Sequence, residues 1–191
     1  MKKYLALFCL ALVLTGCSRE NRALNGAMDL RQQLLSAEGC SFEAKITADY
    51  GDAIHSFSVS CRGDRQGGLQ FTVREPESIS GITGTIDKTG GQLTFTETAL
   101  QFDLLTDRQL SPVSAPWIFL RTLREGYLMN GGEEDGLFHV EARDSYEDQA
   151  LHVDLWLSQE GQPTRGEILF GGRRILTLEV RDFTVEHAGQ V

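Results

Sequence analysis

The chain has 191 residues, of which 41% are hydrophobic and 24% charged, enough for one domain with a substantial core. This composition excludes a disordered tail and a membrane protein with several spans. The 18 basic and 27 acidic residues give a net charge of −9, which argues against a nucleic-acid partner and against simple electrostatic adsorption to anionic lipid.

The N-terminus predicts export and lipid attachment. Two lysines precede an apolar run of roughly ten residues from Tyr4 to Leu14, which suits a secretory signal and is too short to span a bilayer. The run ends in Leu14-Thr15-Gly16-Cys17, which resembles a bacterial lipobox, in which the cysteine is diacylated and becomes the mature N-terminus. An ordinary signal peptide with a chance cysteine is the alternative interpretation.

These features divide the chain into three parts. Residues 1–16 are the expected signal peptide, residues 17–22 the lipidated N-terminus with a short polar tether, and residues 23–191 the folded domain. We therefore expect an extracytoplasmic protein anchored to the cell membrane through its lipid, with the outer membrane as an alternative location if the source has one.

Two cysteines, Cys40 and Cys61, remain in the domain once the signal and the lipidated cysteine are set aside. The segments on either side of residues 49–52 alternate apolar and polar side chains, which predicts a β-hairpin. A register that pairs Phe42 with Val59 also places Cys40 opposite Cys61, at a distance that suits a disulfide. We interpret the pair as a structural disulfide, with two buried free thiols as the alternative.

The rest of the domain alternates between strands and one further helix. Apolar spacing predicts a first helix over residues 23–38, and a second over Pro116–Leu128 that ends near Asn130-Gly131-Gly132, with Ser114 or Ala115 as its N-cap. Besides the hairpin, alternation predicts strands at residues 69–73, 82–86, 93–95, 100–104, 138–142, 151–157, 167–170 and within 175–185.

The order of these elements is a helix, about six strands, a helix and about four strands, which predicts an α+β, mainly β fold. Because the strands are numerous and linked as hairpins, we expect a single curved antiparallel sheet, an incomplete β-barrel, with the helices covering its concave face. We find no internal repeat and no linker within the domain.

Behind a lipobox, this order of elements resembles the LolA/LolB family of lipoprotein carriers over nearly all of residues 22–186. The resemblance implies an incomplete barrel with a helical lid over an apolar cavity that can take acyl chains. In such a fold the concave face of the sheet and the lid helix line the cavity. The candidate lining residues are Ile46, Phe57, Phe71, Phe102, Trp117 and Leu120.

Candidate catalytic and metal sites are few. No nucleophile motif and no phosphate-binding glycine loop occurs, so we expect neither an enzyme nor a cofactor. His139 and Glu141 lie on one predicted strand and His152 and Asp154 on the next, in a register that would oppose His139 to Asp154 and could hold Zn²⁺. We interpret them as solvent-facing pairs instead, because the opposite face is apolar. The acidic run at 133–135 predicts a solvated turn, with docking of a basic partner as the alternative.

The sequence therefore supports two functions that differ in class. In the first, a membrane-anchored, non-enzymatic lipoprotein binds a hydrophobic ligand, an acyl chain or a lipoprotein, in a half-barrel cavity. In the second, side chains fill the cavity and the lipoprotein is a scaffold that binds and stabilises an exported partner. The second version follows a resemblance to the clostridial spore-germination lipoprotein type, and its partner would be a cell-wall hydrolase in sporulation or germination.

Overall fold

A computed structural model describes residues 17–95, 98–102, 105–106, 109–145 and 150–187, so the expected signal peptide and Leu104 lie outside the described residues. The helices are α2 (Cys17–Ser36) and α3 (Ala115–Glu125), with short 3-10 turns η1 (Glu77–Ile79) and η2 (Pro112–Ser114). The strands are β1 (Gly39–Asp49), β2 (Ile54–Asp64), β3 (Leu69–Glu75), β4 (Thr83–Asp87), β5 (Gly90–Phe95), β6 (Thr98–Phe102), β7 (Leu105–Thr106), β8 (Gln109–Leu110), β9 (Tyr127–Glu134), β10 (Leu137–Arg143), β11 (His152–Leu157), β12 (Pro163–Phe170) and β13 (Arg173–Glu186).

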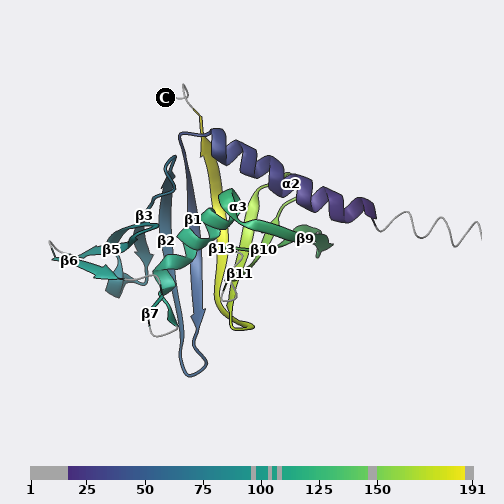
Figure 1. The fold of residues 1–191 in the computed structure, drawn as a ribbon. Coiled ribbons are helices and arrows are strands. Elements are labelled where there is room, and N and C mark those ends of the chain that lie inside the picture. The colour runs from purple at the N-terminus through teal and green to yellow at the C-terminus, as the bar shows by residue number, and fades with distance from the viewer. Residues whose placement is uncertain (1–16, 96–97, 103–104, 107–108, 146–149, 188–191) are drawn as a thin grey trace, which may run out of the picture.

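Eleven of these strands form one antiparallel sheet in the order β6-β5-β4-β3-β2-β1-β13-β12-β11-β10-β9, and β7 pairs separately with β8. β1 pairs with β2 on one side and with β13 on the other, so the first and last strands of the chain meet in the middle. The two edges, β6 and β9, lie at opposite ends of the sheet, which is open (Figure 1).

Alternation along the strands separates an inner face from an outer face. In β1 the side chains of Phe42, Ala44, Ile46 and Ala48 are all buried, and those between them are exposed or half-buried. Successive side chains of a strand point to opposite faces of a sheet, so this pattern assigns the inner face to the core.

Both helices cover the inner face. α3 packs against β2, β12 and β13, and α2 lies against β9 and β10 and also contacts α3 (Figure 1). The core between these layers contains Leu30 and Leu34 of α2 and Phe119 and Leu123 of α3. The expectation of a mainly β fold, with one curved antiparallel sheet and helices on its concave face, is confirmed.

The helices differ from the expected ranges. Helix α2 starts at Cys17, so that residues 17–22, expected as a tether, continue into the helix. Helix α3 begins after Ser114, as predicted, but ends at Glu125, and Gly126 is already extended. The prediction of a helix to Leu128 was wrong, because Tyr127 starts strand β9, which pairs with β10. Five strands, β9 to β13, therefore follow α3, where about four were expected.

The register of the first hairpin also differs from the prediction. Its existence and its faces are confirmed, but Phe42 pairs with Cys61, and Cys40 pairs with Gly63. A four-residue loop joins the pair formed by Asp49 and Ile54, and its ends are linked by a hydrogen bond from the Tyr50 amide to the Ala53 carbonyl, 3.1 Å long. Turn length sets the register of a hairpin, so a longer loop moves every partner while each side chain keeps its face.

Candidate functional site

The inner face beneath α3 is filled by side chains. Of the six candidate lining residues, Ile46, Phe57, Phe71, Trp117 and Leu120 are each at most 9% exposed, and Phe102 alone is half-buried. The first five are therefore packed core residues. A hollow of about 440 Å³ borders Trp117 and Leu120 on the side of the β2–β3 turn, and the role of the six residues in lining a ligand cavity stays a prediction.

Glycines in the strands let α3 approach the sheet closely. A Cβ atom at Gly166 would lie 2.5 Å from the ring of Phe119, and one at Gly63 would lie 2.4 Å from Leu120. The Phe119 ring also lies 6.5 Å, centroid to centroid, from that of Phe42. Side chains of α3 thus occupy the space that a larger residue in the sheet would need, and little room is left for a ligand between helix and sheet.

Hydrogen bonds fix α3 at several points. The indole of Trp117 donates to the Gly67 carbonyl at 2.9 Å, and the guanidinium of Arg124 donates to the carbonyls of Asp64 and Arg65 at 2.6 and 2.8 Å. From α2, the Arg31 guanidinium donates to three carbonyls at the end of α3. Those carbonyls are Leu123 (2.8 Å), Thr122 (3.1 Å) and Gly126 (2.7 Å). α3 is a fixed part of the core, because both the β2–β3 turn and α2 hold it.

Beyond α3, strands β4, β5 and β6 extend the inner face as a wing (Figure 1). Successive pairings place Phe71, Gly84, Leu93 and Leu100 in one row across β3 to β6. Exposure rises along this row, from 3% at Phe71 to 63% at Leu100. Phe95, two residues beyond Leu93 on the same face, is 52% exposed. The wing therefore presents apolar side chains that continue the core outward.

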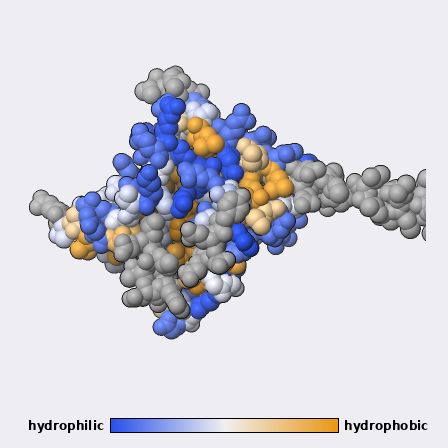
Figure 2. All heavy atoms as spheres, in the orientation of Figure 1, coloured by the Kyte–Doolittle hydropathy of each residue, from blue (hydrophilic) through white to orange (hydrophobic). Residues whose placement is uncertain are grey.

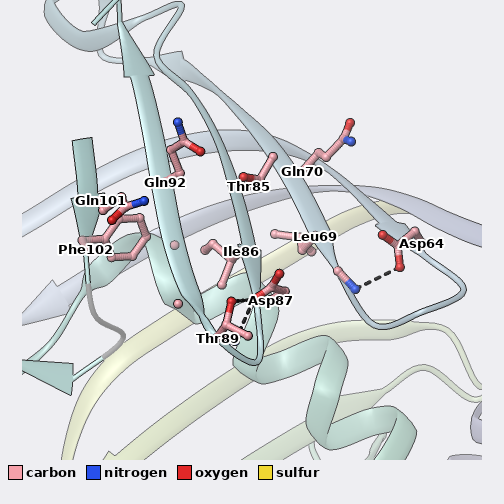
Figure 3. Close-up of a pocket in the computed structure, with 13 residues that line it drawn as sticks. Asp64, Leu69, Gln70, Thr85, Ile86, Asp87, Thr89, Gln92, Gln101 and Phe102 are labelled. Carbon is pink, nitrogen blue, oxygen red and sulfur yellow. Dashed lines mark hydrogen bonds between the residues drawn. The ribbon is translucent and has the colours of Figure 1, made fainter. Parts of the chain in front are cut away.

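A second row, nearer the α3 end of these strands, borders a hollow of about 800 Å³. Leu69, Ile86 and the ring of Phe102 lie along one side of it, and the Phe102 ring covers Gly91 (Figure 3). The polar lining residues Gln70, Thr85, Gln92 and Gln101 alternate with these along β3 to β6, so their side chains belong to the outer face of the wing. The hollow thus takes in both faces of the wing near the β2–β3 and β4–β5 turns, and only its apolar strip belongs to the inner face.

The two cysteines lie on the inner face and are free in the structure, both of them buried. The predicted opposition of Cys40 and Cys61 was wrong, since each pairs with another residue. Burial raises the pKa of the Cys40 thiol to about 11, and burial also raises the pKa of Cys61. Both groups are therefore thiols at neutral pH, and the disulfide stays a prediction.

The histidine cluster lies on the outer face, in a register other than the predicted one. His139 is opposite Trp156, and Glu141 is opposite Asp154. The His139 ring stacks on Trp156 with centroids 4.6 Å apart, and its Nε2 lies 3.3 Å from Asp154 Oδ1. The hydrogen bond to Asp154 raises the pKa of His139. Within the described ranges, no three histidine, cysteine or acidic side chains gather as a metal site.

Trp156 is held from its other side as well. The Arg165 guanidinium lies 4.6 Å from the centre of the indole ring, whose N–H donates to Glu134 at 2.8 Å. Glu134 belongs to the acidic run, of which 133–134 end strand β9 and Asp135 starts the turn. These contacts make the cluster a brace across β9 to β12.

The sequence analysis did not predict that the apolar side chains of the wing would be exposed to solvent. The strand pattern at Leu93, Phe95 and Leu100 was recognised, but only Phe102 was selected as a lining residue. A usable signal was present, because Gly84 and Gly91 alternate with apolar residues within strands, which marks close approach of a neighbouring ring.

Comparison with known proteins gives one sequence match. Residues 1–18 match the family model described as a prokaryotic membrane lipoprotein lipid attachment site. The chain is thus a lipid-anchored lipoprotein of the envelope. No curated protein matches it. Among the described residues, no helix combines the length and the hydropathy needed to cross a membrane.

Several solved structures are similar in fold at low sequence identity. A LolA superfamily protein from Nitrosomonas europaea is 11% identical, with 84% of this chain and 93% of that chain covered and a TM-score of 0.46. LprF from Mycobacterium bovis is 12% identical, with coverages of 86% and 94% and a TM-score of 0.43. The MucA/MucB complex of Pseudomonas aeruginosa is 13% identical, with coverages of 83% and 56% and a TM-score of 0.39.

Proposed function

We propose that this membrane-anchored lipoprotein binds a hydrophobic ligand, an acyl chain or the lipid of another lipoprotein, on the inner face of the wing and without catalysis. The observation that carries the proposal is the row from Phe71 to Leu100, along which buried core passes into exposed apolar surface. An acyl chain laid along this row would contact Leu93, Leu100 and Phe95. It would remove apolar surface from water without displacing α3.

The inner-face part of the hollow beside Phe102 is apolar and adds to the surface that such a ligand would contact. Its strip of Leu69, Ile86 and Phe102 continues the inner face, whereas the amide and hydroxyl side chains of the hollow point to the outer face, away from the ligand. The proposed site lies on the wing, whereas the cavity expected from the sequence lies under the second helix, where Trp117 and Leu120 are buried.

A titration with a fluorescent fatty acid tests this function. The Leu100→Ser variant loses an exposed side chain, so its unfolding free energy should change by less than about 0.5 kcal/mol. Its affinity for the probe should fall roughly tenfold, because a leucine buried on binding contributes about 1.5–3 kcal/mol.

Ile54→Ser is the matched control. Ile54 is 70% exposed at the start of β2, and its side chain belongs to the outer face. Its loss should leave probe affinity unchanged. If the probe does not bind the parent protein, or if both variants bind it equally well, the acyl-chain function is refuted.

The second candidate is a scaffold for an exported protein, such as a cell-wall hydrolase in sporulation or germination. It is favoured by β6, which among the described strands is an edge of the sheet paired with β5 alone and carries Leu100 at its centre. An extended segment of a partner could add to this edge and cover the wing. A photoreactive residue at position 100 should then crosslink to one exported protein in living cells. The same purified variant should bind no fluorescent fatty acid.

A further inference from the structure

Helix α2 has more apolar surface than the core uses. Its buried stripe consists of Ala23, Ala27, Leu30 and Leu34. One position later in each turn runs a second stripe, which we call the outer stripe: Leu24, Met28, Arg31 and Leu35. Met28 is 51% and Leu35 53% exposed, and Leu24 is half-buried. Figure 2 shows apolar surface gathered over α2.

The only charged member of the outer stripe faces inward. The Arg31 guanidinium makes all its hydrogen bonds to the carbonyls that end α3, and its desolvation lowers the Arg31 pKa. A hollow of about 500 Å³ runs past Met28, Arg31 and Leu35, and it is bordered on its polar side by Asp29, Gln32 and Ser36. The stripe itself therefore offers apolar contact along its length, with the exposed Asp29 at its border.

The start of α2 coincides with the membrane anchor. The lipid attachment match ends at residue 18, and the helix begins at Cys17, the expected acylation site. At 1.5 Å per residue, Leu24 lies about 10 Å and Leu35 about 27 Å along the axis from Cys17. A helix joined this directly to an acylated residue can scarcely avoid the bilayer surface.

Charge is also distributed in favour of this contact. The sequence of α2 contains three arginines and two acidic residues, a net charge of +1. Residues 37–191 contain 13 basic and 25 acidic residues, a net charge of −12. An anionic membrane surface would repel the body of the domain and leave α2 as the element that can approach it.

We propose that α2 lies along the membrane surface with the outer stripe at the boundary between headgroups and acyl chains. Helices with an apolar stripe of this kind bind membranes in the interface plane. Because β5 and β6 lie at the opposite end of the molecule from the start of α2, this orientation leaves the wing free of the bilayer (Figure 1). The proposal is independent of what the wing binds.

Quenching by spin-labelled lipid tests the proposal in the lipidated full-length protein. Variants Met28→Cys and Gln33→Cys each accept one environment-sensitive fluorophore, because Cys40 and Cys61 are buried. Gln33 is exposed on the side of α2 opposite the outer stripe, which makes it the matched control. The protein is reconstituted in vesicles of phosphatidylethanolamine and phosphatidylglycerol with a nitroxide high on the acyl chain.

We expect the fluorophore at position 28 to be quenched several-fold more strongly than that at position 33, as an in-plane helix requires. Adding Leu35→Gln to the Met28→Cys variant should reduce that quenching while the anchor still holds the protein on the vesicle. Equal quenching at the two positions overturns the proposal. So does a position-28 signal that changes with protein concentration and not with lipid, which would mean that a second copy covers the stripe.

Discussion

The inner face of the sheet has two regions: the part beneath α3, and the wing formed by β4 to β6. Both carry apolar side chains, but among the described residues only the first is covered by a helix. Where α3 covers the sheet, Phe119 of the helix is fully buried with its ring over Gly166, and in the wing the ring of Phe102, a residue of β6, lies over Gly91 but is only half-buried. Both regions pair an aromatic ring with a strand glycine. What separates them is the presence of a helix on top.

This difference indicates where a ligand can bind without unfolding anything. Six hydrogen bonds from Arg31, Trp117 and Arg124 hold α3 and its end in place, so opening the region beneath it requires breaking them. The wing needs no such step, since its apolar side chains already face solvent. A filled core and an open binding surface are therefore compatible within one sheet.

The largest expected effect comes from removing a ring beneath α3. Phe119→Ala should lower the unfolding free energy by about 3–5 kcal/mol, because it leaves a cavity in fully buried surroundings. Phe102→Ala in the wing should cost less than about half of that, since the ring is already half in water. Urea unfolding followed by circular dichroism measures both. Similar losses would show that the two regions are equally packed and would contradict the comparison.

The next effect concerns the attachment of α3. Arg124 is 8% exposed and donates to two carbonyls, so Arg124→Met should cost about 2–3 kcal/mol by removing both charge-assisted hydrogen bonds, although the Asp64 carbonyl still accepts from the Gly67 amide. Arg121→Met is the control on the same helix, since Arg121 only stacks over the Trp117 ring, 5.2 Å away. Its cost should stay below about 1 kcal/mol. Faster amide exchange throughout α3 is expected in the first variant alone, and equal exchange in both would contradict the attachment.

A matched pair of glycine substitutions sharpens the comparison further. Gly166→Ala forces a methyl group against the buried Phe119 ring and should cost about 1–3 kcal/mol, because that ring cannot move. Gly91→Ala meets Phe102 at 2.1 Å, an even closer approach, yet that ring can swing into solvent. The expected change in unfolding free energy is close to zero, because alanine loses less backbone entropy than glycine on folding into a strand, and this gain offsets the closer contact. A larger loss for Gly91→Ala in thermal unfolding would mean that the wing ring is held firmly.

The faces of the strands were predictable, and their registers were not. Alternation assigns Phe42 and Phe57 to the inner face in any register that keeps the parity of the pairing. Two such registers differ by two positions and move the partner of Cys40 without exposing any core residue. The loop that decides between them is held partly from afar, since the Tyr50 hydroxyl donates to the Leu110 carbonyl at 2.6 Å.

The position at which α3 ends could not be predicted from the sequence either, because it depends on contacts with distant residues. Tyr127 and Leu128 continue the apolar spacing of the helix, so local pattern favours a longer helix. Arg31, which bonds to the last carbonyls of α3, lies 95 residues before Gly126 in the sequence. The open wing escaped prediction similarly, because the pattern of a strand does not reveal whether a helix lies above it.

The smallest effect concerns the cluster around Trp156 on the outer face of β9 to β12. The outer face of the wing carries rows of Thr and Gln side chains instead. His139 is 25% exposed and its protonated Nε2 donates to Asp154. This contact raises the folded-state pKa of His139 above its ordinary value of 6.5. A raised pKa means that the charged form favours folding. Its stabilisation is complete below the unfolded pKa and is lost as the pH rises through the folded pKa.

Between about pH 6 and about pH 8, the unfolding free energy should therefore fall by less than about 1 kcal/mol. This is the contribution typical of an exposed ion pair. His139→Gln keeps a flat polar group against Trp156 but cannot titrate, so the difference between parent and variant should shrink over that same interval. Comparing the two proteins cancels the titration of the other histidines. Urea midpoints at both pH values measure the difference. If that difference is the same at both, His139 contributes through its stacking on Trp156 alone, and the brace is independent of pH.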